Sequence, residues 1–228
     1  MSRTARAFVG EFLGSAGLAA VVVGSGIAAQ RLSPGDVGLQ LFENAFATAL
    51  GLAVLILVFA SVSGAHFNPV VTIVDILLHR RSWSTAAVYL PTQVLGCIAG
   101  AVLANLMFAE PAVSWSATDR SGLHLLLAEA VATAGLILVI FALVRTGRSQ
   151  LAAPAVGAYI GAAYFFTSST SFANPAITIG RMFTDTFAGI APTSALPFIA
   201  AQLVGAAVGW GIVRAIFPVA VPEPVVAA

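Results

Sequence analysis

Long intervals without a charged residue dominate the chain. Five of them contain no Asp, Glu, Lys or Arg: 12–30, 44–74, 82–109, 149–180 and 186–213. A further apolar interval, about 123–144, contains one acidic residue, Glu129. A helix that crosses the hydrocarbon core of a membrane needs about 20 largely apolar residues. The pattern therefore predicts a bundle of membrane-spanning helices.

Two of these intervals, 44–74 and 149–180, are too long for one span and too short for two. Each contains an Asn-Pro pair, Asn68-Pro69 in the first and Asn174-Pro175 in the second. A full span followed by a re-entrant half-helix fits both intervals. We therefore predict an all-α membrane protein with half-helices near 68–79 and 174–184 and with six full spans, at about 7–29, 38–61, 85–107, 123–145, 151–169 and 195–217.

Three short motifs occur twice, in the same order. They are Glu-x4-Ala-Gly-Leu, Asn-Pro-x-x-Thr-Ile and Gln-x-x-Gly-x3-Gly, and their copies begin at Glu11 and Glu129, Asn68 and Asn174, and Gln93 and Gln202. Each predicted half has three full spans, so the second half enters the membrane from the opposite side, as in an inverted repeat. We expect one transmembrane domain, 1–228, with halves of about 1–115 and 116–228 whose Asn-Pro segments meet near the midplane.

The composition removes several classes of protein. Hydrophobic residues make up 59% of the chain and charged residues 8%, whereas a soluble domain carries roughly 25% charge. These values exclude a soluble or disordered chain, and a net charge of +1 leaves no basic patch for nucleic acid. One cysteine, Cys97, and three scattered histidines offer no disulfide, metal site or catalytic cluster. We therefore expect no enzyme activity, no cofactor and no metal.

The positions of the arginines predict the orientation. Seven lie on the side of the predicted termini, at Arg3, Arg6, Arg80, Arg81, Arg145, Arg148 and Arg214, and three on the opposite side, at Arg31, Arg120 and Arg181. Cytoplasmic loops carry the excess of positive residues. We expect a multi-pass protein of the cell membrane with both termini in the cytoplasm.

The two Asn-Pro pairs are good helix starts. Asparagine caps the amino end of a helix, and proline suits the first turn, where its missing N–H has no partner. Two half-helices that meet at membrane depth must line a wet cavity or be buried in protein, and their positive ends oppose the passage of cations. Loop carbonyls and the amides of Asn68 and Asn174 can bond to passing solutes. The pattern therefore favours a pore for small, neutral, hydroxyl-bearing solutes.

The segments Ser63-Gly-Ala-His-Phe-Asn-Pro-Val70 and Ser171-Phe-Ala-Asn-Pro-Ala176 resemble the paired motif of the aquaporin and aquaglyceroporin (major intrinsic protein) family. The resemblance covers essentially the whole chain and implies a passive channel, commonly a homotetramer with one pore per subunit. It also implies that buried Glu11 and Glu129 support the pore loops and that His66 is structural. Val70 stands where the family has alanine, so we expect altered packing or pore width there.

The resemblance also implies a selectivity filter at four positions, counted by the family's spacings: Thr48, Ala162, Ser171 and Ile177. The family usually has arginine at the position of Ile177, so we expect a wide, half-apolar filter without a charge or a large ring. Arg181 lies one helical turn further on. It can supply a displaced charge at the outer mouth, or it can pair with Asp185 or reach the membrane interface, which is the favoured interpretation.

The leading functional prediction is a passive channel for small uncharged solutes: glycerol-like polyols, neutral metalloid hydroxides such as arsenous acid, and water. The first alternative is a water-selective channel, which differs mainly in the size of the filter. A coupled secondary transporter also uses inverted repeats, but the predicted spans lack the several buried ionisable groups that ion coupling tends to need.

Overall fold

The computed structural model describes residues 1–78 and 80–218. It consists of helices, of which six follow the predicted full spans: α1 (Arg3–Leu32), α2 (Val37–Phe59), α4 (Trp83–Met107), α5 (Leu123–Arg145), α6 (Ala152–Phe166) and α8 (Pro192–Ile216). The two predicted half-helices are α3 (Pro69–Leu77) and α7 (Pro175–Gly180), and short 3-10 turns occupy Ser149–Leu151 and Arg181–Phe183. The described part of the chain therefore has the predicted all-α architecture.

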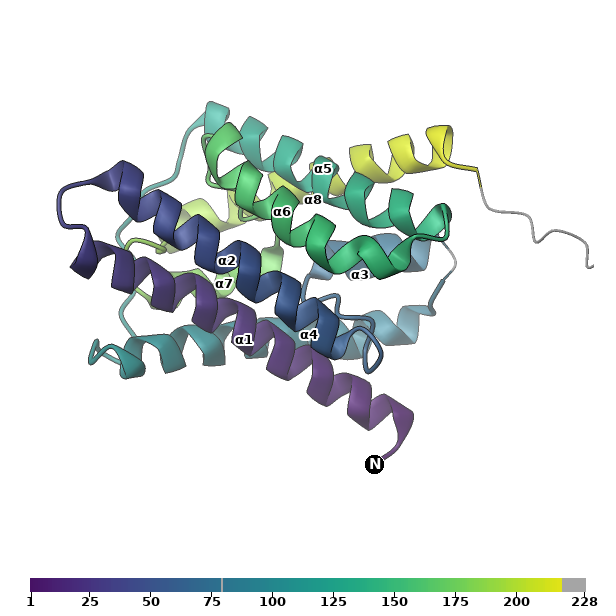
Figure 1. Ribbon diagram of the computed structural model, residues 1–228, viewed down its shortest axis with the longest axis horizontal. Coiled ribbons are helices and arrows are strands. Elements are labelled where there is room, and N and C mark those ends of the chain that lie inside the picture. The colour runs from purple at the N-terminus through teal and green to yellow at the C-terminus, as the bar shows by residue number, and fades with distance from the viewer. Residues whose placement is uncertain (79, 219–228) are drawn as a thin grey trace, which may run out of the picture.

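The long helices run side by side in one bundle (Figure 1). Helix α1 begins and α8 ends at the same end of the bundle, as an even number of crossings requires. Helix α3 lies in the half of the bundle nearer that end, and α7 lies in the opposite half. The half-helices therefore enter the bundle from opposite sides.

Five helices are long and apolar enough to cross a membrane: α1, α2, α4, α5 and α8. Helix α6 is shorter than the predicted span 151–169, with 15 residues and a length of about 22 Å. It ends at Phe166 because Thr167 is extended, and the N–H and hydroxyl of Thr167 both bond to the carbonyl of Ala163. The Ser/Thr-rich segment before Asn174 is therefore a loop.

Glycines allow two helix pairs, α1 with α4 and α5 with α8, to pack closely. A Cβ atom on Gly100 of α4 would lie 2.0 Å from the Ala16 carbonyl oxygen of α1. A Cβ atom on Gly209 of α8 would lie 2.7 Å from the Ala134 carbonyl oxygen of α5. Small residues permit such backbone approach in membrane bundles. Two of the repeated motifs, Glu-x4-Ala-Gly-Leu and Gln-x-x-Gly-x3-Gly, thus pack against each other in both halves.

Candidate functional site

Asn68 and Asn174 cap the two half-helices at the centre of the bundle. The side-chain oxygen of Asn68 accepts the N–H of Val70 at 3.1 Å, and that of Asn174 accepts the N–H of Ala176 at 2.9 Å. The side-chain nitrogens cross over between the loops. Asn68 Nδ2 donates to the carbonyl of Ala173, and Asn174 Nδ2 donates to that of Phe67, both at 2.8 Å. Each amide nitrogen has two N–H groups, so each retains one donor for a solute.

The loops before the half-helices contain backbone that L-residues rarely adopt. Ala65 and Phe67 have φ of 51° and 50°, and the equivalent Ser171 and Ala173 have φ of 52° and 47°. Non-glycine residues in this left-handed region are strained and need support from their surroundings. Both loops therefore depend on the groups behind them.

Two buried carboxylates lie behind these loops. Glu11 accepts hydrogen bonds from the N–H groups of His66 and Phe67, at 3.0 and 2.8 Å, and from the Ser63 hydroxyl at 2.6 Å. Glu129 accepts the N–H groups of Phe172 and Ala173, both at 2.9 Å. Both carboxylates are fully buried. Bonds from loop N–H groups to a carboxylate are charge-assisted, which offsets the strain of the loops.

A glutamine links each carboxylate to the half-helix beside it. Gln93 of α4 donates to Glu11 at 2.7 Å and to the hydroxyl of Thr72 in α3 at 3.0 Å. Gln202 of α8 donates to Glu129 at 2.7 Å and to Thr178 of α7 at 2.9 Å. No role was predicted for these glutamines and threonines from the sequence. Their signal was present, because all four belong to the repeated motifs.

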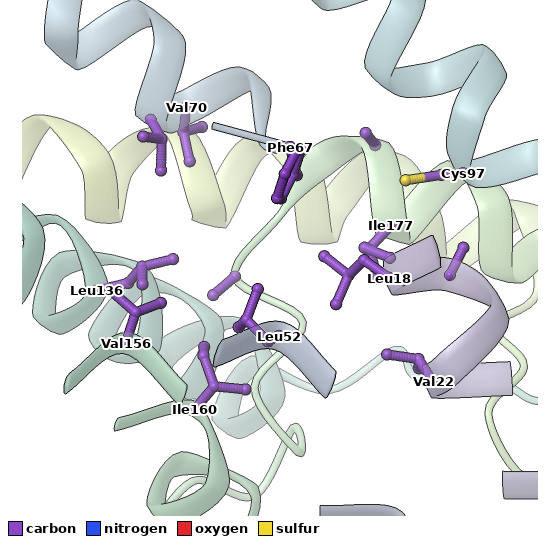
Figure 2. Close-up of a cluster of buried hydrophobic side chains, with 14 of the residues drawn as sticks. Leu18, Val22, Leu52, Phe67, Val70, Cys97, Leu136, Val156, Ile160 and Ile177 are labelled. Carbon is purple, nitrogen blue, oxygen red and sulfur yellow. The ribbon is translucent and has the colours of Figure 1, made fainter. Parts of the chain in front are cut away.

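A narrow cavity of about 60 Å³ passes the two asparagines. Its wall is formed by α1, α2, α5, α6, both half-helices and both loops. Figure 2 shows buried apolar side chains around this wall, among them Leu18 of α1, Leu52 of α2, Val156 and Ile160 of α6, and Ile177 of α7. A wider cavity of about 820 Å³ adjoins it on the α3 side, and the two share lining residues such as His66 and Val71.

Three of the four predicted filter residues line the narrow cavity: Thr48, Ser171 and Ile177. Ala162 does not line it, because it lies on the exposed face of α6. Helical periodicity directs the residues at i, i+4 and i+8 to one face, and this inward face carries Val156, Ile160 and Tyr164.

Tyr164 changes the expected filter. Its hydroxyl donates to the hydroxyl of Thr48 at 3.2 Å, so an aromatic ring that was not predicted lies beside one of the predicted filter residues. The hydroxyl of Ser171 is buried and has no hydrogen-bond partner among the described residues. This part of the cavity wall therefore presents three hydroxyl groups, of Thr48, Tyr164 and Ser171, together with apolar side chains.

Arg181 also lines the narrow cavity, and its side chain is buried with 3% exposure. The guanidinium carbon lies 3.4 Å from the centroid of the Phe172 ring, and Nε donates to the carbonyl of Ala188. Arg181 neither pairs with Asp185, whose carboxylate accepts the N–H of Ala117 at 2.9 Å, nor extends to the surface, since its side chain is buried. Helix α7 ends at Gly180, so the four-residue spacing that places two side chains on one helix face does not apply.

Val70 and Asp75 of α3 contact other parts of the protein and do not line the narrow cavity. Val70 is fully buried in the hydrophobic core and does not line the narrow cavity, so its extra methyl groups do not narrow the pore. Asp75 pairs with Arg80 at 2.9 Å and with Arg81 at 3.1 Å. Its carboxylate also lies 3.6 Å from Nε2 of His66.

The loop between α4 and α5 closes over the α7 side. Arg120 donates from Nε to the carbonyl of Gly189 at 3.0 Å, and its N–H bonds to the Ser194 hydroxyl at 3.0 Å. Hydrogen bonds from Ser121 and Ser194 hold the pKa of the neighbouring Asp119 carboxyl below its usual range. The loop thus brings a second guanidinium to this side of the molecule.

Comparison with known proteins decides the family. A family model described as "Major intrinsic protein" matches residues 1–173. The chain belongs to this family. The chain is 45% identical over 210 residues to aquaglyceroporin AqpS of Rhizobium meliloti (strain 1021), covering 92% of this chain and 89% of that protein. It is 37% identical over 119 residues to the lens fiber major intrinsic protein of Gallus gallus, covering 52% and 43%.

A solved structure gives the fold independently. The aquaglyceroporin from Plasmodium falciparum superposes with a TM-score of 0.72 at 23% identity, covering 93% of this chain and 96% of that chain. The predicted aquaporin-like fold is confirmed. As a member of the major intrinsic protein family, the chain is a passive multi-pass membrane channel and not an enzyme.

Proposed function

We propose that this channel conducts glycerol-like polyols, neutral metalloid hydroxides such as arsenous acid, and water. The observation that carries the proposal is the two-sided chemistry of the narrow cavity. Thr48, Tyr164 and Ser171 supply hydroxyl groups, and Ile177 belongs to the apolar wall. A polyol has hydroxyl groups along one side and C–H groups along the other, so it can satisfy both surfaces at once. The similarity to an aquaglyceroporin supports the same solute class.

We assign the filter to Thr48, Ser171 and Ile177 together with Tyr164, and the central pore motif to Asn68-Pro69-Val70 and Asn174-Pro175-Ala176. Glu11 and Glu129 act behind the loops and do not contact the solute, and His66 supports its loop through its bond to Thr72. Residues 1–115 and 116–228 are the two halves of one channel domain. The protein resides in the cell membrane with both termini in the cytoplasm, and it assembles as a homotetramer.

Stopped-flow light scattering on purified protein in liposomes tests the solute class. We expect glycerol and arsenous acid to enter protein-containing vesicles much faster than empty ones, with water flux also raised. Leu196→Ala is a matched control, because Leu196 is 75% exposed on α8 and lies away from both cavities. Water flux without solute flux would indicate a water-selective channel. Saturable flux that requires an ion gradient would indicate a coupled transporter.

A further inference from the structure

The two mouths of the narrow cavity carry different charges at equivalent positions. We define the α3 mouth, where the narrow cavity adjoins the wider one, by His66, Asp75, Arg80 and Arg81, and the α7 mouth by Ser171, Phe172 and Arg181. Asp75 lies seven residues after Asn68, and Arg181 lies seven residues after Asn174. Asp75 pairs with two arginines, so this group has a net charge of +1, but its three side chains line the wider cavity and not the narrow one. Arg181 has no acidic partner within 4 Å among the described residues.

Arg181 is held in place by contacts that do not balance its positive charge. Its guanidinium stacks on Phe172, and one donor, Nε, bonds to the Ala188 carbonyl. The terminal nitrogens make no hydrogen bond to another described residue, and the side chain borders the cavity. The unpartnered Ser171 hydroxyl borders the same cavity. Polar groups are therefore free to meet a solute at this level of the pore.

Arg120 strengthens the positive character of the α7 mouth from behind. Its guanidinium carbon lies 5.0 Å from the centroid of the same Phe172 ring, but it does not line the narrow cavity. The positive end of the α7 dipole at Asn174 has the same sign. A cation that enters from this side approaches a fixed guanidinium and then a positive helix end.

We propose that Arg181 is the residue that excludes cations from this channel, and that charge selection is thereby separated from size selection at Ile177. This inference rests on the proposed conduction of neutral solutes. Within the proposed filter, Ile177 adds no charge and no long side chain, so it leaves room for a polyol. One turn further out, Arg181 opposes cations through its fixed positive charge.

Proteoliposomes with an entrapped pH-sensitive dye report proton leak, and light scattering reports glycerol flux on the same preparation. Wild-type protein is expected to pass glycerol with a low proton leak. Arg181→Gln should retain glycerol flux and raise the proton leak at least about fivefold, the factor for like unit charges about 4 Å apart in water. Arg181→Lys retains the charge and should keep the leak low.

Two further variants locate the effect. Arg31→Gln removes a positive charge from an exposed pair with Glu110, away from both cavities, and should leave the leak unchanged. The double variant Ile177→Arg/Arg181→Gln moves the charge inward by one turn. It should restore the low leak and reduce glycerol flux, because the new side chain occupies the narrow section.

The failures are distinguishable. A folded Arg181→Gln protein with normal glycerol flux and the wild-type leak would overturn the role of Arg181 and leave the proposed function intact. Absence of glycerol flux in the wild-type protein would overturn the proposed function itself. Arg181→Cys provides a second measurement, because Cys97 is buried. Thiol reagents that add an ammonium group should lower its leak and those that add a sulfonate should raise it; equal leaks with both would contradict the proposal.

Discussion

The loops that lead into α3 and α7 place aromatic rings at equivalent positions, two residues before Asn68 and Asn174. His66 packs edge-on against Tyr89 of α4, with ring centroids 5.5 Å apart and an interplanar angle of 71°. Phe172 packs against Phe198 of α8 at 5.2 Å and 72°. The surroundings of the two rings differ. Nδ1 of His66 bonds to Thr72 at 3.0 Å, whereas the face of Phe172 receives the guanidinium of Arg181.

This comparison separates what the repeat preserves from what it varies. Both halves keep the features that hold the backbone: the asparagine caps, the carboxylates, the glutamines and the ring pairs. They differ in the polar groups at the mouth, where an acid pairs with two arginines in one half and an arginine has no acidic partner among the described residues in the other. The scaffold is thus symmetric, and the chemistry that a solute meets is directional.

The loop carboxylates offer the largest test of the shared scaffold. Glu11 accepts four hydrogen bonds and Glu129 three, because the first loop adds the Ser63 hydroxyl. Bonds to a charged group contribute about 1.5–3 kcal/mol each. We expect Glu11→Gln to lower the free energy of unfolding by about 4 kcal/mol, and Glu129→Gln to lower it by less.

Unfolding in detergent, followed by tryptophan fluorescence, measures these losses. Glu110→Gln is the control, since Glu110 forms an exposed pair with Arg31 that contributes at most about 1 kcal/mol. Equal losses for Glu11→Gln and Glu110→Gln would show that the buried carboxylates do not support the loops.

The close helix pairs give the next largest effect. Gly100→Ala would place Cβ 2.0 Å from the Ala16 oxygen, whereas Gly209→Ala would place it 2.7 Å from the Ala134 oxygen. Overpacking of this kind costs about 1–3 kcal/mol. We therefore expect Gly100→Ala to lower the free energy of unfolding by about 3 kcal/mol, and Gly209→Ala to lower it by less.

Gly211→Ala controls for helix propensity in the same measurement. A Cβ atom on Gly211 of α8 meets nothing within 4 Å, so alanine there should raise stability by roughly 0.5–1 kcal/mol. A loss of stability at Gly211 as large as that at Gly100 would mean that the α1–α4 contact is not the cause.

The features that could be predicted from the sequence are those that occur twice. Asn68 and Asn174 each cap a half-helix, and Glu11 and Glu129 each lie behind a loop, because the repeated motifs place the same residue types in corresponding positions. The mouths lack this redundancy. Arg181 and Asp75 occupy equivalent positions with opposite charge, so no copy in the other half indicated how either would pair.

Two errors have a common physical origin. Counting residues from Asn174 assigned Ala162 to the filter, and a four-residue spacing joined Arg181 to Asp185. Spacing rules hold only while the backbone keeps one conformation. Helix α6 ends at Phe166 and α7 at Gly180, so both counts cross a helix end, and the side-chain directions beyond it depend on tertiary contacts.

The width of the narrow cavity can be tested at equivalent positions of the two half-helices. Ile177 and Val71 each follow their asparagine by three residues, and both line the narrow cavity. Val71 also borders the wider cavity of about 820 Å³, which leaves room for a longer side chain. We expect Ile177→Arg to reduce glycerol flux about tenfold while water flux is retained, and Val71→Arg to reduce glycerol flux less.

Stopped-flow measurements with water and glycerol on the same vesicles check this order. Retained water flux distinguishes a narrowed pore from a misfolded protein. Unchanged glycerol flux in a folded Ile177→Arg channel would mean that residue 177 does not set the width of the filter.

The smallest effect concerns the hydrogen bond that only one ring makes. The Thr72 hydroxyl donates to the Asn68 carbonyl at 3.2 Å, so it accepts from both Gln93 and Nδ1 of His66. Thr178 makes the corresponding bonds to Asn174 and Gln202, but Phe172 offers no donor. Thr72→Val should therefore cost about 1 kcal/mol more than Thr178→Val in the free energy of unfolding. In a His66→Phe background, which gives the α3 mouth the same kind of ring as the α7 mouth, that difference should vanish. If the difference between the two stability losses persists in this background, its cause is the packing of Thr72 and not the imidazole of His66. The histidine ring would then be interchangeable with phenylalanine.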